Sequence, residues 1–384
     1  MRPTSAQIDL SAVAHNVSLL ADLTAPAKLC VVVKADAYGH GAVPVARTAM
    51  SAGASWLAVA LVEEGAELRE GGIEAPILLL SEPRPKEMIE VVSHRLRPTV
   101  YSPEGIAAVT AAQSTATEPL GVHLKIDTGM HRVGVPPDEA SHLAQTLSDK
   151  PGLALEGIWT HCATADDINN PFADTQLDRF DKALEEIAAA GIKPPVRHAA
   201  NSAALLTRRR SHYDLVRVGI SVYGISPLPY ASEIDSQAGL SEASNRVLQQ
   251  LRPAMQLRSE VSFVKKVLAG ERISYGQLHE FSADTAVATV PIGYADGVRR
   301  DFGLQGGVVL IGGQRCPVVG AVTMDQLMVD VGLVASVQTG DEVVLIGNQG
   351  SETVTATEIA QKANTIPYEV VCDVGKRVRR EYVD

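Results

Sequence analysis

The chain has 384 residues, and 46% of them are apolar, so it can bury a large core and is long enough for two domains. This composition excludes an intrinsically disordered or fibrous protein. The 34 Lys and Arg residues are outnumbered by 45 Asp and Glu residues, which gives a net charge of -11, and the longest basic run is 208–210. We therefore expect no nucleic-acid partner.

The opening segment 1–20 lacks a basic region followed by an uninterrupted apolar stretch, and no apolar run approaches the roughly 20 residues needed to span a bilayer. We therefore expect a cytoplasmic protein without membrane association. Among the aromatic residues, 9 Tyr outnumber 5 Phe and 2 Trp. Because tyrosine combines an apolar ring with a polar hydroxyl, this excess suggests that some of the rings have polar roles.

Between residues 28 and 224, short β-branched runs alternate with amphipathic segments, which is typical of repeated βα units. Strands are predicted at 29–33, 56–60, 77–80, 98–101, 122–126, 155–160, 196–199 and 215–218. Helices are predicted at 44–52, 63–70, 85–93, 103–112 and 174–190. This α/β pattern favours a (β/α)8 TIM-type barrel, with an open doubly wound sheet as the alternative because strand order cannot be read from one sequence.

The segment 225–245 is rich in Pro, Ser, Gly and acidic residues and predicts a linker or surface excursion. After it, strands with little intervening helix are predicted at 255–268, 285–292, 308–311, 315–319, 327–331 and 342–346. We therefore predict two domains, a barrel over 1–240 and a mainly β C-terminal domain over 241–384. The first residues, up to about residue 10, are expected to pack with the second domain.

In a parallel barrel, reactive groups are expected at the carboxyl ends of the strands. Lys34 directly follows the apolar run 30–33 and would lie at the rim of the barrel core. Burial and neighbouring cations would lower its pKa and favour the neutral amine, which attacks carbonyl groups. The alternative is a lysine that extends its charged end into solvent.

Two further strand ends offer backbone N–H groups. Asn201 and Ser202 precede an apolar helical segment and resemble a helix N-cap, and Gly219 and Ile220 end the last barrel strand. Such amides after the seventh and eighth strands often bind phosphate in barrels, although ordinary capping and packing would produce the same pattern. Together with a strand-end lysine, they point to pyridoxal 5'-phosphate, whose aldehyde reacts with lysine amines.

Arg217 lies in the eighth strand, where its permanent charge allows it to donate to the cofactor's pyridine nitrogen without releasing a proton. A structural ion pair with Asp214 is the alternative. No metal site is predicted, because His40, His161 and His198 lie on separate segments. The cysteines form no CxxC pair and are expected to be buried thiols.

These segments resemble the motifs of the bacterial alanine racemases over essentially the whole chain, from 7–10 to 368–370. The most specific is 32–41 (VVKADAYGHG), which is similar to the family's cofactor-lysine signature. Supporting segments follow in order at 125–130 with Arg132, 160–161, 201–202, 217–220, 274–276, 293–297, 324–326 and 366–369. The resemblance implies a barrel plus a β domain, assembled as a head-to-tail homodimer in which each chain completes its partner's site.

The resemblance also implies roles for individual residues. Lys34 would hold the cofactor and act as the base toward D-alanine, and Tyr275 of the other chain would be the base toward L-alanine. The remaining cofactor contacts would come from Tyr38, His161, Asn201, Ser202, Arg217, Gly219, Ile220 and Tyr368. The substrate would be bound by Arg132, the backbone N–H of Met324, and Tyr294 at the entrance, and Lys125 could carry a carbamate that orients Arg132. The implied reaction supplies D-alanine for peptidoglycan.

Three residues depart from the family's usual pattern: His131, Cys162 and Thr323. They leave the implied reaction class unchanged but bear on substrate breadth. A racemase that accepts serine or other small amino acids is therefore an alternative. A pyridoxal-phosphate-dependent decarboxylase of similar two-domain build is less favoured, because its lysine and cysteine motifs differ from those of this chain. A non-catalytic protein that binds the cofactor is less favoured because such proteins usually lack a second domain.

Overall fold

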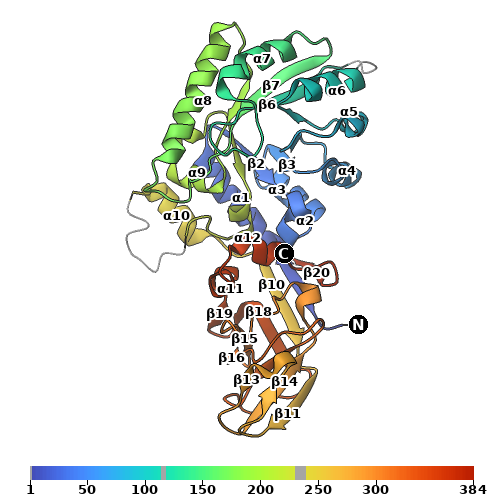
Figure 1. The fold of residues 1–384 in the computed structure, drawn as a ribbon, viewed down its shortest axis with the longest axis vertical. Helices are drawn as coiled ribbons and strands as arrows, with labels where there is room; N and C mark the ends of the chain where they lie inside the picture. Colours follow the sequence, from blue (N-terminus) through green and yellow to red (C-terminus); the bar gives the residue numbers. More distant parts are fainter. Residues whose placement is uncertain (1, 114–117, 230–238) are drawn as a thin grey trace. The chain divides into compact units, whose positions relative to one another are not determined.

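The computed structural model describes residues 2–113, 118–229 and 239–384, which form two compact units (Figure 1). The barrel unit comprises Val13–Ala37 and Ala42–Arg252, and the β unit comprises the residues up to Ala12, Tyr38–Gly41 and Pro253–Asp384. The chain thus changes units near residue 253, whereas the boundary at residues 240 and 241 stays a prediction.

The barrel unit contains eight parallel strands, in two hydrogen-bonded runs ordered β4-β3-β2-β9 and β5-β6-β7-β8. They are β2 (Lys28–Val32), β3 (Trp56–Val59), β4 (Ile77–Leu79), β5 (Thr99–Val100), β6 (Leu120–Lys125), β7 (Leu153–Trp159), β8 (Val196–His198) and β9 (Leu215–Val218). Leu79 N donates to Arg97 O at 2.9 Å and Arg217 N donates to Ala200 O at 3.1 Å, which joins the two runs into a closed barrel. The predicted barrel and its eight strands are confirmed, and the open-sheet alternative is excluded.

Helices follow most of these strands and lie around them (Figure 1). They are α1 (Leu10–Thr24), α3 (Ala42–Ser51), α4 (Val62–Glu70), α5 (Met88–Ser93), α6 (Pro103–Gln113), α7 (Ala140–Ser148), α8 (Phe172–Ala189), α9 (Ser202–Thr207) and α10 (Glu242–Gln250). All five predicted helices are present. In α8, Leu177 and Phe180 are fully buried, and Gly191 with φ +84° follows the helix end, as expected for a left-handed C-terminal stop.

The predicted linker is wrong at its C-terminal end. Residues 242–245 begin α10, because Ser241 caps the helix by accepting a hydrogen bond from Ser244 N at 3.0 Å. Residues 230–238 of that prediction lie outside the described residues. The C-terminal end of the predicted linker is therefore the start of a helix.

The β unit is built from three sheets and two short helices. The largest sheet has the order β16-β15-β18-β10-β1-β20, with β19 paired to β18. Its strands are β1 (Ser5–Asp9), β10 (Met255–Glu260), β15 (Val308–Ile311), β16 (Gln314–Pro317), β18 (Glu342–Gln349), β19 (Glu352–Val354) and β20 (Arg379–Val383). The others are β11 (Phe263–Val267), β14 (Thr285–Val290) and β17 (Leu327–Asp330), then β12 (Arg272–Ile273) and β13 (His279–Glu280), with helices α11 (Ala356–Lys362) and α12 (Pro367–Cys372).

The single strand predicted over 255–268 is two strands, β10 and β11. Val261 N donates to Asp341 O and Ser262 N donates to Thr289 O, both at 2.8 Å, so the chain changes sheets between these two residues. The N-terminal β1 pairs antiparallel with β10 and parallel with β20. The two ends of the sequence therefore share one sheet.

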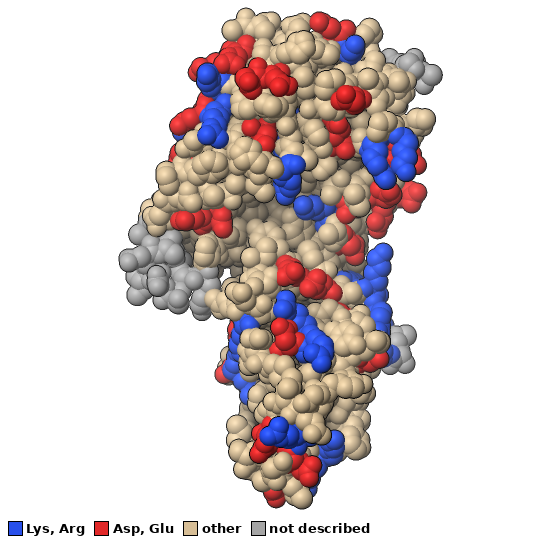
Figure 2. Space-filling model, viewed as in Figure 1, with Lys and Arg blue, Asp and Glu red and all other residues tan. Residues whose placement is uncertain are grey.

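Basic and acidic side chains are interspersed over the face that Figure 2 shows. Many of them form ion pairs, such as Arg197 with Asp214 at 2.7 Å. Among the residues that the structure describes, none of the helices has the length and apolar character needed to cross a lipid bilayer.

Candidate active site at the carboxyl ends of the barrel strands

Lys34 lies at the carboxyl end of β2, after a strand that is buried from Leu29 onward, and begins the short turn α2 (Lys34–Gly39). The φ angles of residues 35–38 lie between +51° and +53°, so this turn is left-handed although it contains no glycine before Gly39. Such a conformation costs about 1 to 2 kcal/mol per residue. It is held by hydrogen bonds from Ala37 N to Val33 O at 2.8 Å and from Ala35 N to the Glu64 carboxylate at 2.6 Å. The end of β2 is therefore fixed in a strained conformation, as often occurs at functional sites.

His161 follows β7 and lies among four cationic side chains. Burial lowers its pKa well below the ordinary value, and the charges of Arg217, Arg132, Lys125 and Lys34 lower it further. The imidazole is therefore neutral at neutral pH, and its Nδ1 lies 3.3 Å from Nη2 of Arg217, where it can accept a hydrogen bond. The concentration of positive charge makes this end of the barrel attractive to anions.

Arg217 is buried in β9 and is held by the barrel core. Its Nη1 lies 2.8 Å from Nδ1 of His198, and its Nη2 donates to Thr160 O at 2.9 Å and to Ala199 O at 3.0 Å. The ion pair with Asp214 considered from the sequence is wrong, because Asp214 binds Arg197 instead. Burial lowers the pKa of Arg217 to about 10, so the side chain stays cationic at neutral pH.

The segments after β8 and β9 meet, as the sequence predicts. Asn201 caps α9 by accepting a hydrogen bond from Ala204 N at 2.9 Å, which confirms the predicted N-cap. The hydroxyl of Ser202 accepts from Gly219 N at 3.0 Å, so the start of α9 lies against the turn that begins at Ile220. Ser202 and Ile220 are buried. Four residues assigned to one cofactor are therefore brought together.

Lys125 ends β6 and is 1% exposed. Its Nζ donates to Val133 O at 2.8 Å and lies 5.0 Å from the centroid of the Trp159 ring. Burial lowers its pKa to about 8, with further lowering by the charges of Arg132 and Arg217. At pH 7 this amine is therefore mostly protonated, but its neutral fraction is larger than that of an exposed lysine.

Arg132 lies in the loop after β6, which Asp127 shapes. The Asp127 carboxylate accepts hydrogen bonds from Gly129 N at 3.1 Å and His131 N at 3.0 Å. The ring of His131, one of the departures from the family pattern, lies 3.2 Å from the same carboxylate. This histidine therefore contributes to the loop that presents Arg132.

Sequence reasoning missed Gln176, which organises the loop after β7. Gln176 is fully buried on α8. Its Nε2 donates to His161 O at 3.0 Å, and its Oε1 accepts from Ala163 N at 2.7 Å. A signal was present in the sequence, because a polar Gln176 directly precedes Leu177 on the apolar face of the predicted helix.

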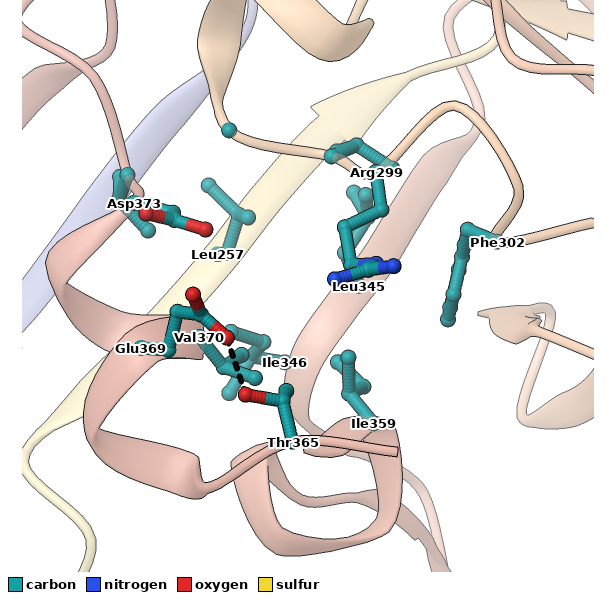
Figure 3. Close-up of a pocket in the computed structure, with 13 residues that line it drawn as sticks. Leu257, Arg299, Phe302, Leu345, Ile346, Ile359, Thr365, Glu369, Val370 and Asp373 are labelled. Carbon is teal, nitrogen blue, oxygen red and sulfur yellow. Dashed lines mark hydrogen bonds between the residues drawn. The ribbon is translucent and has the colours of Figure 1, made fainter. Parts of the chain in front are cut away.

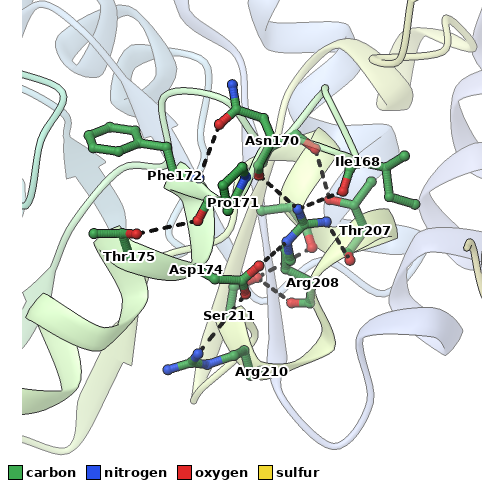
Figure 4. A network of polar contacts seen from close by, with 12 residues as sticks. Ile168, Asn170, Pro171, Phe172, Asp174, Thr175, Thr207, Arg208, Arg210 and Ser211 are labelled. Carbon is green, nitrogen blue, oxygen red and sulfur yellow. Dashed lines mark hydrogen bonds and ion pairs between the residues drawn. The ribbon is translucent and has the colours of Figure 1, made fainter.

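Sequence reasoning also missed Arg208, and Figure 4 shows its hydrogen bonds to the loop after β7. Its Nη2 donates to Ile168 O at 3.0 Å and to Asn170 O at 3.2 Å, and its Nε donates to Asp174 at 3.0 Å. The side chain of Arg208 is only 10% exposed. It therefore links the loop after β7 to α8 and α9.

The other assigned residues lie in the β unit. The rings of Tyr38 and Tyr368 are 6.1 Å apart, and burial raises the pKa of Tyr38 above its ordinary value, as does the neighbouring Tyr368. Tyr294 N donates to Thr323 O at 3.0 Å, next to Met324. The side chains of Tyr275, Tyr294 and Met324 are 68%, 43% and 53% exposed. These exposed groups are available to bind another molecule.

A shallow pocket lies in the β unit beside α12. In Figure 3 the side chains of Arg299, Glu369 and Asp373 point toward it, between apolar walls that include Leu257 and Phe302. None of the residues assigned to the cofactor or substrate lines this pocket. This pocket is therefore not part of the candidate active site.

Comparisons with known proteins match both units. A model described as "Alanine racemase, N-terminal domain" matches residues 8–227, and one described as "Alanine racemase, C-terminal domain" matches residues 254–382. The chain is 46% identical to an alanine racemase of Symbiobacterium thermophilum, over all of this chain and 97% of that protein. It is 42% identical to one of Desulfovibrio desulfuricans, over all of this chain and 99% of that protein.

Solved structures agree with these matches. The alanine racemase of Bacillus anthracis, solved with bound L-Ala-P, has a TM-score of 0.89 and 36% identity, covering all of this chain and 96% of that one. The enzyme of Streptomyces lavendulae has a TM-score of 0.90 and 38% identity, covering all of this chain and 98% of that one. Fold and matches together define a pyridoxal-phosphate-dependent isomerase with a barrel and a β domain. The chain belongs to the alanine racemase family.

Proposed function

We propose that this protein interconverts L-alanine and D-alanine by moving the Cα proton between two bases, Lys34 and Tyr275. The observation that carries the proposal is the placement of Lys34 at the end of a buried barrel strand, beside the cationic group around His161, in a chain of this family. Because racemisation removes a proton from one face of Cα and returns it to the other, two bases on opposite faces suit the reaction better than one.

The residues present fit pyridoxal 5'-phosphate. Lys34 supplies the amine that would hold its aldehyde carbon, and Ser202, Gly219 and Ile220 would bind its phosphate. Among the described residues, none accepts a hydrogen bond from Nε of Arg217, so this donor is available to the pyridine nitrogen. When bound, the cofactor withdraws the electron pair that deprotonation leaves on Cα.

The remaining cofactor contacts are assigned to His161, Asn201, Tyr38 and Tyr368. His161 is neutral and would lie beside the cofactor ring, where Arg217 fixes its orientation. Because Arg217 stays cationic at neutral pH, it would donate to the pyridine nitrogen without protonating it. This restrains electron withdrawal and favours return of the proton over side reactions.

Arg132 and the backbone N–H of Met324 would bind the substrate carboxylate, and Tyr294 would narrow the entrance. The neutral fraction of the Lys125 amine would add to CO2 and release one N–H proton to solvent, which gives a carbamate whose negative charge would orient Arg132. Native mass spectrometry tests this proposal: in CO2-containing buffer the wild type should gain the mass of one CO2, and Lys125→Met should not.

We assign the second base and the substrate-binding Met324 to a partner chain, in a head-to-tail homodimer. The large exposed areas of Tyr275 and Met324 support this assignment, because a base and a binding group need contact with the substrate. The enzyme would act in the cytoplasm and supply D-alanine for peptidoglycan. A broader racemase that also accepts serine is the second candidate, favoured by the departures at His131 and Cys162.

The test is cofactor-dependent formation of D-alanine from L-alanine. The wild type should form D-alanine only with pyridoxal 5'-phosphate, and Lys34→Ala should abolish both formation and covalent cofactor attachment. Lys28→Ala is the matched control, because Lys28 is exposed at the opposite end of the same strand. Equal rates for L-serine and L-alanine would favour the broader enzyme, and cofactor binding without D-alanine would contradict the proposal.

A further inference from the structure

A chain of polar side chains crosses the barrel core behind Arg217. Nη1 of Arg217 lies 2.8 Å from Nδ1 of His198, and Nε2 of His198 lies 2.8 Å from Nδ1 of His123. Nε2 of His123 faces the Glu156 carboxylate at 3.9 Å, and that carboxylate accepts from Arg97 Nε at 2.7 Å. Both histidines are fully buried.

The direction of these hydrogen bonds follows from their chemistry. An arginine can only donate, so Nδ1 of His198 must accept. Burial lowers the pKa of His123 to about 3 and that of His198 well below its ordinary value, so both rings are neutral, with one donor and one acceptor each. His198 therefore donates through Nε2 to His123, and His123 carries its proton on Nε2, which has no hydrogen-bond partner among the described residues and lies 3.9 Å from the Glu156 carboxylate. The two hydrogen bonds therefore run in one direction, from Arg217 to His198 and from His198 to His123.

The surrounding core holds these rings in place. The ring of Trp159 stacks on His198 with an interplanar angle of 8° and a centroid distance of 5.5 Å. Trp56 contacts the ring of His123 edge-on at 5.4 Å. Barrel cores are normally filled by Val, Ile and Leu, and a buried imidazole is unfavourable unless it is hydrogen-bonded. The position of each ring is therefore set by packing as well as by its hydrogen bonds.

Gly157 provides the space that His123 occupies. The two residues are partners in the β6–β7 register, and a Cβ atom at position 157 would lie 2.3 Å from Nδ1 of His123. Any larger residue at 157 would displace the imidazole or the strand. The chain to Arg217 therefore depends on this glycine as well as on the histidines.

We propose that His123 is a positioning residue for the cofactor site, acting through His198 to orient the guanidinium of Arg217. Without His123 as acceptor, the Nε2 proton of His198 has no partner, so the tautomer that accepts from Arg217 is less strongly favoured. The guanidinium then keeps its carbonyl contacts through Nη2 but loses the restraint on Nη1. This inference rests on the proposed function, in which Arg217 faces the cofactor.

The test compares full-length wild type with His123→Leu, His123→Asn and Gln113→Met, by two measurements. The first is long-range ¹H–¹⁵N NMR of the histidine rings without cofactor, and the second is the dissociation constant for pyridoxal 5'-phosphate. In the wild type, His198 should show the Nε2-protonated form. His123→Leu should alter this signature and weaken cofactor binding about three- to tenfold, the effect expected for one lost hydrogen bond.

His123→Asn places an amide oxygen near the position of Nδ1 and should restore part of the affinity. Gln113→Met is the matched control, because it removes another buried polar group of the barrel unit, the donor to Glu118 O, that has no contact with the chain to Arg217. It should leave the His198 signature unchanged. If His123→Leu does not fold, Gly157→Ala displaces the same ring from the opposite side and should give the same two changes.

The outcomes separate this inference from the proposed function. An unchanged His198 signature and unchanged cofactor affinity in His123→Leu or Gly157→Ala would overturn the positioning role while leaving the racemase assignment intact. A wild type that binds no pyridoxal 5'-phosphate would overturn the proposed function, whatever the histidine signals show. Equal effects of Gln113→Met and His123→Leu would also overturn the positioning role.

Discussion

Lys125 places its ammonium nitrogen 5.0 Å from the ring centroid of Trp159, inside the barrel and 1% exposed. The cation–π contact and the hydrogen bond to Val133 O do not compensate for burial and for the nearby arginines, because the pKa of Lys125 falls from 10.5 to about 8. The folded protein therefore binds this proton more weakly than the unfolded chain does.

This difference predicts a dependence of stability on pH. Because the folded pKa is lower than the unfolded one, Lys125 destabilises the fold fully below about pH 8, and the penalty is relieved as pH rises from about 8 toward 10.5. Lys125→Met should be about 1 to 2 kcal/mol more stable than wild type at pH 7, after allowing for the lost hydrogen bond. Urea unfolding in CO2-free buffer should show the gap closing by pH 10. Lys28→Met is the control, and parallel curves for wild type and Lys125→Met would contradict the prediction.

Gln176 should affect both stability and catalysis. Gln176→Met keeps the size of the side chain but leaves Ala163 N and His161 O without their partners. We expect a loss of about 2 to 3 kcal/mol in the free energy of unfolding and a lower kcat, because the loop that carries His161 is less well fixed. Denaturant unfolding and the racemase assay measure the two effects. Gln145→Met on the exposed face of α7 should change neither, and a similar loss there would show that the effect is not specific to Gln176.

Arg208 and Arg210 form a matched pair of arginines. Arg208→Ala removes hydrogen bonds to two loop carbonyls and should lower stability by about 2 to 3 kcal/mol and weaken cofactor binding. Arg210→Ala breaks only exposed ion pairs, with Asp174, Asp178 and Asp181, so its effect should stay below about 1 kcal/mol. Thermal unfolding with and without pyridoxal 5'-phosphate distinguishes them. Similar losses in both variants would refute a special role for Arg208.

Tyr275→Phe tests the two-base mechanism. Loss of the phenol should reduce racemisation by about 10² to 10⁴-fold, the usual contribution of a general acid or base. Lys34 should still exchange the Cα proton of D-alanine with solvent, whereas exchange from L-alanine should be lost. Proton NMR in D2O follows both exchanges, so that D-alanine is the internal control. Retained exchange from L-alanine would mean that another group deprotonates it.

Much of the barrel could be predicted because each strand is a short apolar run bounded by turn residues. The cap at Asn201 was predictable for a similar reason, since the bond to Ala204 N is local in sequence. The contacts of Gln176 and Arg208 were not, because they join segments 13 to 40 residues apart and depend on how α8 packs after the barrel closes. The left-handed turn after Lys34 has no local signal either, because none of residues 35–38 is a glycine.

Several elements of the β unit were not predicted from the sequence, and two of these strands depend on distant partners. β1 and β20 pair with each other although they lie at opposite ends of the sequence. Their short runs are stabilised by a shared sheet and have little preference for strand structure alone. Helix α12 begins at Pro367, a start signal that was present but unused.

The stacking of Trp159 on His198 has a spectroscopic consequence. The chain has only 2 tryptophans, and both Trp56 and Trp159 lie buried in the barrel unit. Tryptophan emission therefore reports on the barrel alone, and the β unit emits only through tyrosine. Circular dichroism in the far ultraviolet follows both units. If the two probes give different unfolding midpoints, the barrel and the β unit unfold in separate steps.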